Sequence, residues 1–418
     1  MKCLKKSVVI FITAVCLLIT GCGDTGSLSK LPSSSFHEDK QKLTIMHIDA
    51  DNKRFQDFIE ETEKKLDMEI TVEKCPSNAD NRQAKISTIL ASGDKNIDLI
   101  SVNDEMISEF KHKGYLEPLE KNVMTEEVRD SFPQKYLESI CEENGHIYSV
   151  PFQMDIMMFW VNQELLKQAG LDEIKNTGDF DILQKSLKNP DQYAYGDAWE
   201  NTHVYNSLSQ FVNFWGGDYF DWTDPKTKDA ARYMKSMLDE KNTSPAQFVD
   251  QYEQMEEKFI RGKYGCVFMY TSALGTFLDA DVYGKNEIHM APLPVLHKKK
   301  ATNIATWQYV LNNASENKDA AVRFLQYAAG YEGSTEYAKI MKSYPARVDV
   351  IENEDIDLEG IDMIRKYLRE YTLNARPLCE NSMGAVSDMG KLFQGYVLGQ
   401  CEEDSFFEQA QNCINTYY

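Results

Sequence analysis

The sequence predicts an α/β fold on the strength of three observations. Strand and helix signals alternate between residues 43 and 114, residues beyond about 155 become mostly helical, and the chain of 418 residues is long enough for two lobes with their own cores. Strands that alternate with helices form a mainly parallel sheet that is covered on both faces. Ligands of such sheets bind at the loops beyond the carboxyl ends of the strands.

The N-terminus resembles a secretory signal peptide followed by a lipid-attachment site. Three lysines in the first six residues precede an apolar run from Val8 to Ile19, which is too short to span a bilayer comfortably. Gly21 and Cys22 follow, as in the bacterial lipobox, whose cysteine becomes the lipidated N-terminus after cleavage. We expect residues 1–21 to be removed and Cys22 to carry lipid, palmitate included, that anchors the protein to the outer face of the cell membrane. The alternative is an ordinary signal peptide with an incidental cysteine.

The segment 22–41 is rich in serine and lacks an apolar period, which predicts a flexible tether. Removal of residues 1–21 takes away three lysines and no acid, so the formal net charge of −21 becomes −24. This acidity argues against a nucleic-acid partner, and it either solvates the surface or favours cationic ligands. Six cysteines follow Cys22 without the spacing of a metal site, so disulfides are permitted but not required.

The first folded region predicts three strand–helix units. In order, the expected elements are a strand Leu43–Ile48, a helix containing Phe55–Leu66, a strand Glu69–Val72, a helix ending at Gly93, a strand Ile97–Val102 and a helix from Asp104 to Gly114. Glycine ends two of these helices because it readily adopts the left-handed backbone conformation found just beyond a helix.

Helices predominate in the rest of the chain. Asp224 and Pro225 start one of them, because Asp caps free N–H groups and Pro suits the first turn. The other expected elements are the strands Tyr264–Tyr270, Ile288–Leu296 and Thr306–Leu311, a helix capped by Ser315 that contains Val322–Ala329, and two C-terminal helices that contain Val386–Phe393 and Phe406–Ile414. Val150–Phe152 and Ala291–Pro294 are stiffened by proline and are candidate hinges, unless their prolines merely end strands.

Five short motifs follow one another along the chain: Gly114–Leu119; Gly145–Pro151 with Trp160–Asn162 and Ala169–Leu171; Phe259–Cys266; Pro292 with Pro294; and Asn317–Ala321. Their order resembles that of the bacterial extracellular solute-binding protein family 1, whose best-known members bind maltose and other sugars. The resemblance to this family covers nearly all of the mature chain, and these motifs are its most specific pieces. The chain departs from many relatives at Ala305-Thr306, where a pair such as Gly-Gly is common, and in the acidic loop Asp49–Asn52.

The resemblance implies a two-lobe, periplasmic-binding-protein-like fold of type II with a ligand cleft between the lobes. Residues 42–152 and 289–345 would form lobe 1, and residues 153–288 and 346–418 would form lobe 2. The implied protein is the monomeric substrate-binding lipoprotein of an ABC importer, without cofactor or metal, which captures a sugar or oligosaccharide by lobe closure and delivers it to the permease subunits. The alternatives are a binding protein for polyamines or other small solutes, and a sensor that docks on a membrane kinase.

A sugar site needs flat aromatic rings for the apolar face of the sugar and carboxylates or amides for its hydroxyls. Four aromatic residues lie beside polar residues at element boundaries and are candidates for stacking on a sugar: Trp199, Trp215, Tyr270 and Trp307. For each of them, packing in the core or at the rim is the alternative. Trp160 lies within an apolar run and is expected in the core.

Polar candidates follow the predicted strands and crossovers. They are Asp49 and Asp51 after the first strand, Asp104 after the third, Gln153 and Asp155 after the first hinge, and Arg347 near an expected return between lobes. Asp104 has an alternative role as a helix cap, and Arg347 as a surface residue.

No catalytic or metal motif stands out. Asp49 to Glu60 has the length of an EF-hand loop, but Lys53 occupies a ligand position and Arg54 replaces the glycine of the sharp turn. The sequence lacks a His-Glu-x-x-His motif, a Gly-x-Ser-x-Gly elbow and a phosphate loop. A surface glycoside hydrolase needs only two carboxylates, but these should recur at strand ends, and no such repeat is present. We therefore expect a binding protein and not an enzyme.

Overall fold

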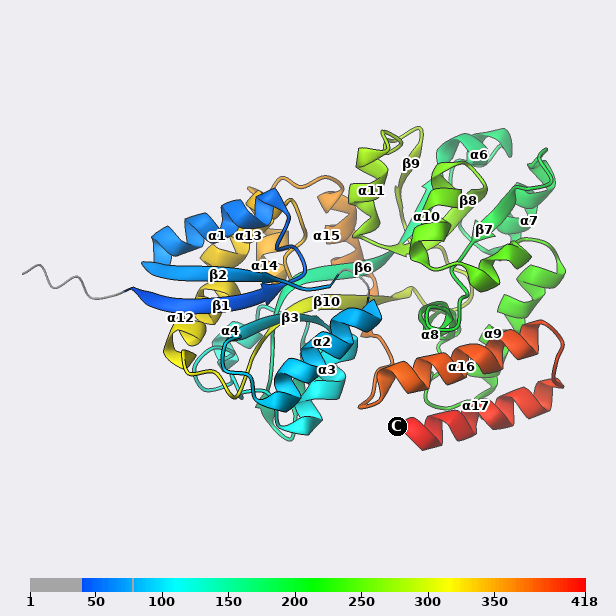
Figure 1. Cartoon of the computed structure of the whole chain (residues 1–418). Coiled ribbons are helices and arrows are strands. Elements are labelled where there is room, and N and C mark those ends of the chain that lie inside the picture. Colours follow the sequence, from blue (N-terminus) through cyan, green and yellow to red (C-terminus); the bar gives the residue numbers. More distant parts are fainter. Residues whose placement is uncertain (1–39, 77–78) are drawn as a thin grey trace, which may run out of the picture. The chain divides into compact units, whose positions relative to one another are not determined.

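The computed structural model describes residues 40–76 and 79–418, whose strands form a nine-stranded sheet and a separate two-stranded one (Figure 1). The expected signal peptide 1–21, Cys22 and nearly all of the expected tether 22–41 lie outside the described residues. Within the described ranges, no helix combines the length and the apolar character needed to cross a membrane.

The first half of the large sheet confirms the predicted strand–helix units. Its elements are β1 (Gln41–His47), α1 (Lys53–Leu66), β2 (Met68–Lys74), α2 (Ala79–Ser92), β3 (Leu99–Asn103) and α3 (Asp104–Phe110). β1 pairs in parallel with both β2 and β3, as alternating strands and helices predict. The third helix is shorter than expected, because α3 continues only as a 3₁₀ turn (Lys111–Lys113) up to Gly114, whose φ of 68° ends it.

Two long strands connect the halves of the sheet: β6 (Val150–Asn162) and β10 (Ala301–Leu311). They pair with each other in antiparallel orientation; β10 also pairs with β3, and the far end of β6 pairs with β8 (Tyr264–Tyr270). Figure 1 shows them running from the blue strands on the left toward the green elements on the right. β10 is longer than the predicted strand Thr306–Leu311, and β6 was not predicted as a strand, because nearly every residue of β6 is buried and no in–out alternation marks it in the sequence.

The second half is built on β8, which has its predicted bounds, together with β7 (Tyr193–Gly196) and β9 (Ile288–Ala291). β9 ends at Ala291 instead of the expected Leu296. The almost wholly buried helix α8 (Val204–Trp215) packs against β10 and against α9 (Pro225–Asp239). Helix α9 begins as predicted, with the side chain of Asp224 accepting a hydrogen bond from the Lys226 amide.

The C-terminal helices α16 (Ser382–Val397) and α17 (Glu403–Tyr417) were predicted and pack against each other, and α16 also contacts α3 and α8. Ser315 does not cap α12 (Lys318–Ala329) as expected: Asn317 precedes that helix, and the Ser315 hydroxyl donates to buried Asp98 at 2.6 Å. The lobe boundaries expected from the sequence stay predictions. The remaining elements are α4 (Glu126–Arg129), α5 (Gln134–Tyr136), a π-helical turn (Leu137–Cys141), β4 (Glu142–Glu143), β5 (His146–Ile147), α6 (Gln163–Gln168), α7 (Thr177–Ser186), a 3₁₀ turn (Pro245–Val249), α10 (Tyr252–Ile260), α11 (Ala273–Asp279), α13 (Tyr331–Met341), α14 (Val348–Glu352), α15 (Ile361–Glu370) and β11 (Thr372–Ala375).

Candidate ligand-binding site

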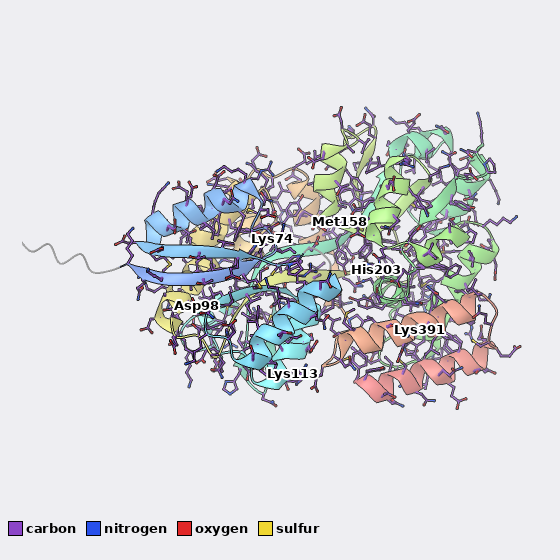
Figure 2. The ribbon with its side chains drawn as sticks, viewed as in Figure 1. Lys74, Asp98, Lys113, Met158, His203 and Lys391 are labelled. Atoms are coloured by element: carbon purple, nitrogen blue, oxygen red, sulfur yellow. The ribbon has the colours of Figure 1, made fainter. Side chains whose placement is uncertain are left out.

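A cavity of about 360 Å³ lies beside the middle of β6 and β10, where the two halves of the sheet meet. Its lining comes from α2, α3 and the end of β3 on one side, and from residues 202–206, α10 and β8 on the other. Figure 2 labels one of the lining residues, His203, near the centre of the view. The volume is in the range of pockets that hold small organic ligands.

Strand pairing brings several of the lining residues together. Trp307 of β10 pairs with Asn103 at the end of β3, and Ala305 pairs with Asp155 of β6. The register of β10 against β6 shifts directly after Trp307, and such bulges redirect side chains next to binding sites. Ala305 and Thr306, where the chain departs from many relatives, also line the cavity.

Aromatic rings form part of the cavity wall. The rings of Tyr252 and Tyr270 meet edge to face with their centroids 5.9 Å apart, and the Tyr270 hydroxyl donates to Asn206 Oδ1 at 3.0 Å. Trp307 is partly exposed, and the Arg82 guanidinium lies 5.4 Å from the centre of its ring. These rings present apolar faces to the C–H groups or cations of a ligand.

A buried charged cluster centred on Arg376 borders the cavity. The Arg376 guanidinium forms a bidentate pair with Asp104, its Nε lying 3.0 Å from Asp104 Oδ2, and its Nη1 donates to Glu105 Oε1 at 2.6 Å. The Tyr205 hydroxyl donates to the same Glu105 oxygen at 2.8 Å and accepts from Arg376 at 2.6 Å. Glu105 and Tyr205 lie on α3 and α8, so the cluster links the two halves of the sheet.

Burial controls the protonation of these groups. It raises the pKa of Glu105, against the opposing effect of its hydrogen bonds with Tyr205 and Asn103. It also raises the pKa of Asp155, and it lowers the pKa of Arg376 to about 9, which still leaves the guanidinium charged at neutral pH.

Four of the ten residues predicted for the ligand site line this one cavity: Asp104, Asp155, Tyr270 and Trp307. Both carboxylate oxygens of Asp104 contact Arg376, and the helix cap of α3 is Asn103, whose side chain accepts from the Met106 amide. The cap proposed as an alternative role for Asp104 is therefore provided by its neighbour.

Two predicted tryptophans are buried away from the cavity. Trp199 has no exposed surface and packs between Phe248 and Phe393, at centroid distances of 5.6 and 5.4 Å. Trp215 is 6% exposed and stacks on His297 at 5.0 Å. Trp160 is fully buried, as expected of a core residue.

The four remaining candidates also lie outside the cavity lining. Asp49 lies next to the buried His47, and Asp51 forms an exposed ion pair with Lys74. Gln153 precedes the cavity along β6, and its Oε1 accepts from the Tyr337 hydroxyl at 3.1 Å. Arg347 is 8% exposed and donates to the Ala329 carbonyl at 2.7 Å and to Ser131 and Asp349.

Several lining residues were not predicted from the sequence, notably Arg82, Glu105, Tyr252 and Arg376. Arg376 and Asp104 are 272 positions apart in the sequence, so no local sequence pattern could predict that they form an ion pair. Glu105 adjoins the predicted Asp104, so the acidic start of α3 was the signal available for it.

Cysteines and metal-ligating residues add no second centre to the described part of the chain. The cysteines at 75, 141, 266, 379, 401 and 413 are free thiols. Across residues 40–76 and 79–418, no group of three or more His, Cys, Asp and Glu side chains has an arrangement that could hold a metal ion.

The fold and the sequence both match known proteins. An ABC transporter solute-binding protein from Thermotoga lettingae, solved with α-D-tagatose, superposes with a TM-score of 0.75 at 18% identity over 90% of this chain and 99% of the other. The cyclic α-maltosyl-1,6-maltose-binding protein of Arthrobacter globiformis gives 0.75 at 17% identity, over 90% of this chain and 98% of the other. The described fold is thus the two-lobe α/β fold of periplasmic binding proteins, with a ligand cleft between the lobes.

Curated relatives match a shorter stretch. A probable amino-acid ABC transporter periplasmic-binding protein, y4oP of Sinorhizobium fredii, is 24% identical over 239 residues. The match spans 54% of this chain and 54% of that relative, so the chain spans about half the length of the curated relative. The sequence profile of the bacterial extracellular solute-binding proteins matches residues 49–335, which is more than half of the chain. The chain therefore belongs to the bacterial extracellular solute-binding protein family.

Proposed function

We propose that this protein captures a sugar or an oligosaccharide outside the cytoplasm and delivers it to the permease of an ABC importer. The observation that carries the proposal is the cavity beside β6 and β10, which is lined from both halves of the sheet. A ligand in this cavity would contact both halves at once. Trp307 and Tyr270 would supply flat rings for the apolar face of a sugar, and Asp155 and Asn206 would supply acceptors for its hydroxyls.

The relatives support both parts of this proposal. The names of the Sinorhizobium and Thermotoga proteins assign them to ABC transporters, and the Thermotoga and Arthrobacter structures are named for the saccharides that they bind. The lining of the cavity contains several hydrogen-bonding groups beside aromatic rings, which is the mixture that a polyhydroxylated ligand needs.

The mechanism we propose is capture by closure, without chemistry on the ligand. The ligand binds one lobe in an open form, and the contacts from the other lobe form only as the lobes close. A ligand that prefers the closed form by about 5.5 kcal/mol takes a 1:99 population to 99:1. We propose the sequence-derived lobes, residues 42–152 with 289–345 and residues 153–288 with 346–418, as the moving bodies.

We also propose that the mature protein is a monomer held at the outer face of the cell membrane through lipid on Cys22. The serine-rich segment 22–41 would let the folded part sample the permease at high effective concentration.

A ligand screen tests the proposal directly. The purified protein without residues 1–22 is screened by thermal shift against hexoses, polyols, maltodextrins, polyamines and amino acids, because a ligand that binds the native state raises the melting temperature. We expect a saccharide to give the largest shift, calorimetry to show one site per chain, and the saccharide to be recovered unchanged. A larger shift with an amino acid or a polyamine would mean that the protein binds that class of ligand instead of saccharides. Cleavage of the saccharide would overturn the role as a binding protein.

A further inference from the structure

The acidic residues that line the cavity are not equivalent. Asp104 is fully buried and both of its carboxylate oxygens contact the Arg376 guanidinium. Glu105 shares that guanidinium and also accepts from Tyr205. The protein itself therefore supplies the positive charge and the hydrogen-bond donors that these two carboxylates need.

Asp155 has no such charge partner. It lies in the middle of β6, is 9% exposed and lines the cavity. Its Oδ1 accepts from the Thr271 hydroxyl at 2.7 Å and from the Ser272 amide at 2.8 Å. Among residues 40–76 and 79–418, no arginine, lysine or histidine forms an ion pair with Asp155, and the groups that hydrogen-bond to it, the hydroxyls and amides of Thr271 and Ser272, are all neutral. The protein thus supplies neutral hydrogen-bond donors but no counter-charge to this carboxylate at the wall of the cavity.

The surroundings of Asp155 suit a cation. Tyr270 directly precedes Thr271, whose hydroxyl donates a hydrogen bond to Asp155. The ring of Tyr270 contacts the ring of Tyr252 edge to face. Glu253, which follows Tyr252 on α10, adds a second acid to the lining and stays exposed. The two arginines of the lining are held by other groups: Arg376 binds Asp104 and Glu105 with its guanidinium 6.0 Å from the centre of the Tyr270 ring, and Arg82 lies over the Trp307 ring. Aromatic faces and an uncompensated carboxylate together attract ammonium groups.

We propose that Asp155 determines specificity, and that the ligand is an amino sugar whose protonated amine binds the Asp155 carboxylate. The inference rests on the proposed function, because it places the amine on a saccharide. An ammonium group would give the buried carboxylate the counter-charge that the protein does not supply, whereas a neutral hydroxyl would give it only a hydrogen bond. A sugar acid would bring a second negative charge to the same place.

Three sugars of similar size separate the contributions of charge and shape. Glucosamine carries the amine, N-acetylglucosamine carries the same nitrogen without charge, and glucose carries a hydroxyl there. Calorimetric titrations at pH 7 into the purified protein should show that glucosamine, or its β-1,4-linked dimer, binds at least about tenfold more tightly than either neutral sugar.

The variant Asp155→Asn keeps an acceptor for Thr271 and Ser272 but removes the charge. We expect it to fold, to lose the preference for glucosamine and to bind glucose within about threefold of the wild type. Asp357→Asn removes an exposed acid that does not line the cavity and serves as the control, with no change in either affinity expected.

The outcomes separate this inference from the proposed function. Tight binding of neutral sugars with no gain from the amine overturns the role of Asp155 and leaves the saccharide proposal standing. Retention of the glucosamine preference in Asp155→Asn also overturns that role. If spermidine binds in an Asp155-dependent manner and no saccharide binds, the ammonium site is upheld and the saccharide proposal fails. If Asp155→Asn does not fold, Glu253→Gln is measured instead, and an unchanged glucosamine preference in that variant counts against the acidic end of the cavity as the amine site.

Discussion

Trp199 and Trp307 carry the same side chain in very different surroundings. Trp199 is enclosed by Phe248 and Phe393 without exposed surface, whereas Trp307 is partly exposed at the cavity beside Arg82. The same substitution should therefore affect different properties of the protein at the two positions. A buried ring contributes mainly to folding, and a ring at a cavity wall contributes mainly to binding.

We predict that Trp307→Ala weakens saccharide binding by about 1–2 kcal/mol with little loss of stability, because it removes one stacking face. Trp199→Ala should lower the free energy of unfolding by about 3–5 kcal/mol, because it leaves a large cavity in the core. Calorimetric titration and urea unfolding of both variants check this. Equal effects of the two substitutions on binding would contradict the placement of the site.

Glu256 on α10 should make stability depend on pH. Burial, followed by the charges of Glu253 and Asp155, raises the pKa of Glu256 to about 7 from an ordinary value near 4.5. The folded state therefore holds this proton more tightly than the unfolded chain does, and the resulting stabilisation is complete below about pH 4.5 and disappears as the pH rises through 7.

The variant Glu256→Gln isolates this contribution from that of all other titrating groups. Between pH 5 and pH 8, the free energy of unfolding of the wild type should fall relative to the variant by about 2 kcal/mol. Urea unfolding of both proteins across this range measures the difference. Parallel pH profiles would show that Glu256 titrates normally.

The sequence predicted part of the site at the residue scale. Four of the predicted residues line the cavity: Asp104, Asp155, Tyr270 and Trp307. Each lies at or near the place where a strand ends or passes from one half of the sheet to the other, and such places can be predicted from the sequence. Trp199 and Trp215 have similar polar neighbours in sequence, yet tertiary packing encloses them, and composition near a residue does not report packing. Arg376 could not be predicted, because its partners lie on α3 and α8, far away in the sequence.

At the scale of elements, the prediction succeeded where the hydrophobic period was clear. The units from β1 to α3, the strand β8 and the helices α9, α16 and α17 all occur where apolar spacing or a cap signal predicted them. It fell short for β6 and β10, because both are buried on both faces and so lose the alternation of a half-exposed strand. These two strands carry Asp155 and Trp307, so the missed elements are those that position the site.

The Arg376 cluster connects elements that would separate if the lobes opened. Glu105 on α3 accepts from Tyr205 on α8, and Arg376 follows β11 and binds both. Opening would therefore require these buried hydrogen bonds to break.

We predict that Tyr205→Phe lowers the free energy of unfolding by about 1–2 kcal/mol and shifts the ligand-free protein toward the open form. Tyr195→Phe is the matched control: the Tyr195 hydroxyl is equally buried and donates to Asp197 at 2.7 Å, within one half of the sheet. X-ray scattering without ligand should show a larger radius of gyration for Tyr205→Phe alone. An unchanged radius would mean that the cluster does not hold the halves together.

At the scale of the whole molecule, delivery of a ligand to a permease depends on where the protein lies relative to the membrane. The sequence carries a formal net charge of −21 and the lipobox-like Gly21-Cys22. A lipid chain on Cys22 followed by a flexible tether would keep an acidic, water-exposed protein beside its permease.

We predict that Cys22→Ser moves most of the protein from the membrane fraction to the medium without changing its affinity for ligand. Fractionation and immunoblotting of a bacterium that expresses each form would measure this. Equal retention of the variant in the membrane fraction would show that Cys22 is not the anchor.

We propose that one small ligand is held between the two halves of the sheet, beside the crossing strands β6 and β10. The crystal structure of the protein with its tightest-binding saccharide is the decisive measurement. It should show the ligand in the cavity with a ring face against Trp307 and a polar group within hydrogen-bond distance of Asp155. A ligand bound elsewhere on the surface, with this cavity filled only by water, would show that the site is not between the two halves of the sheet.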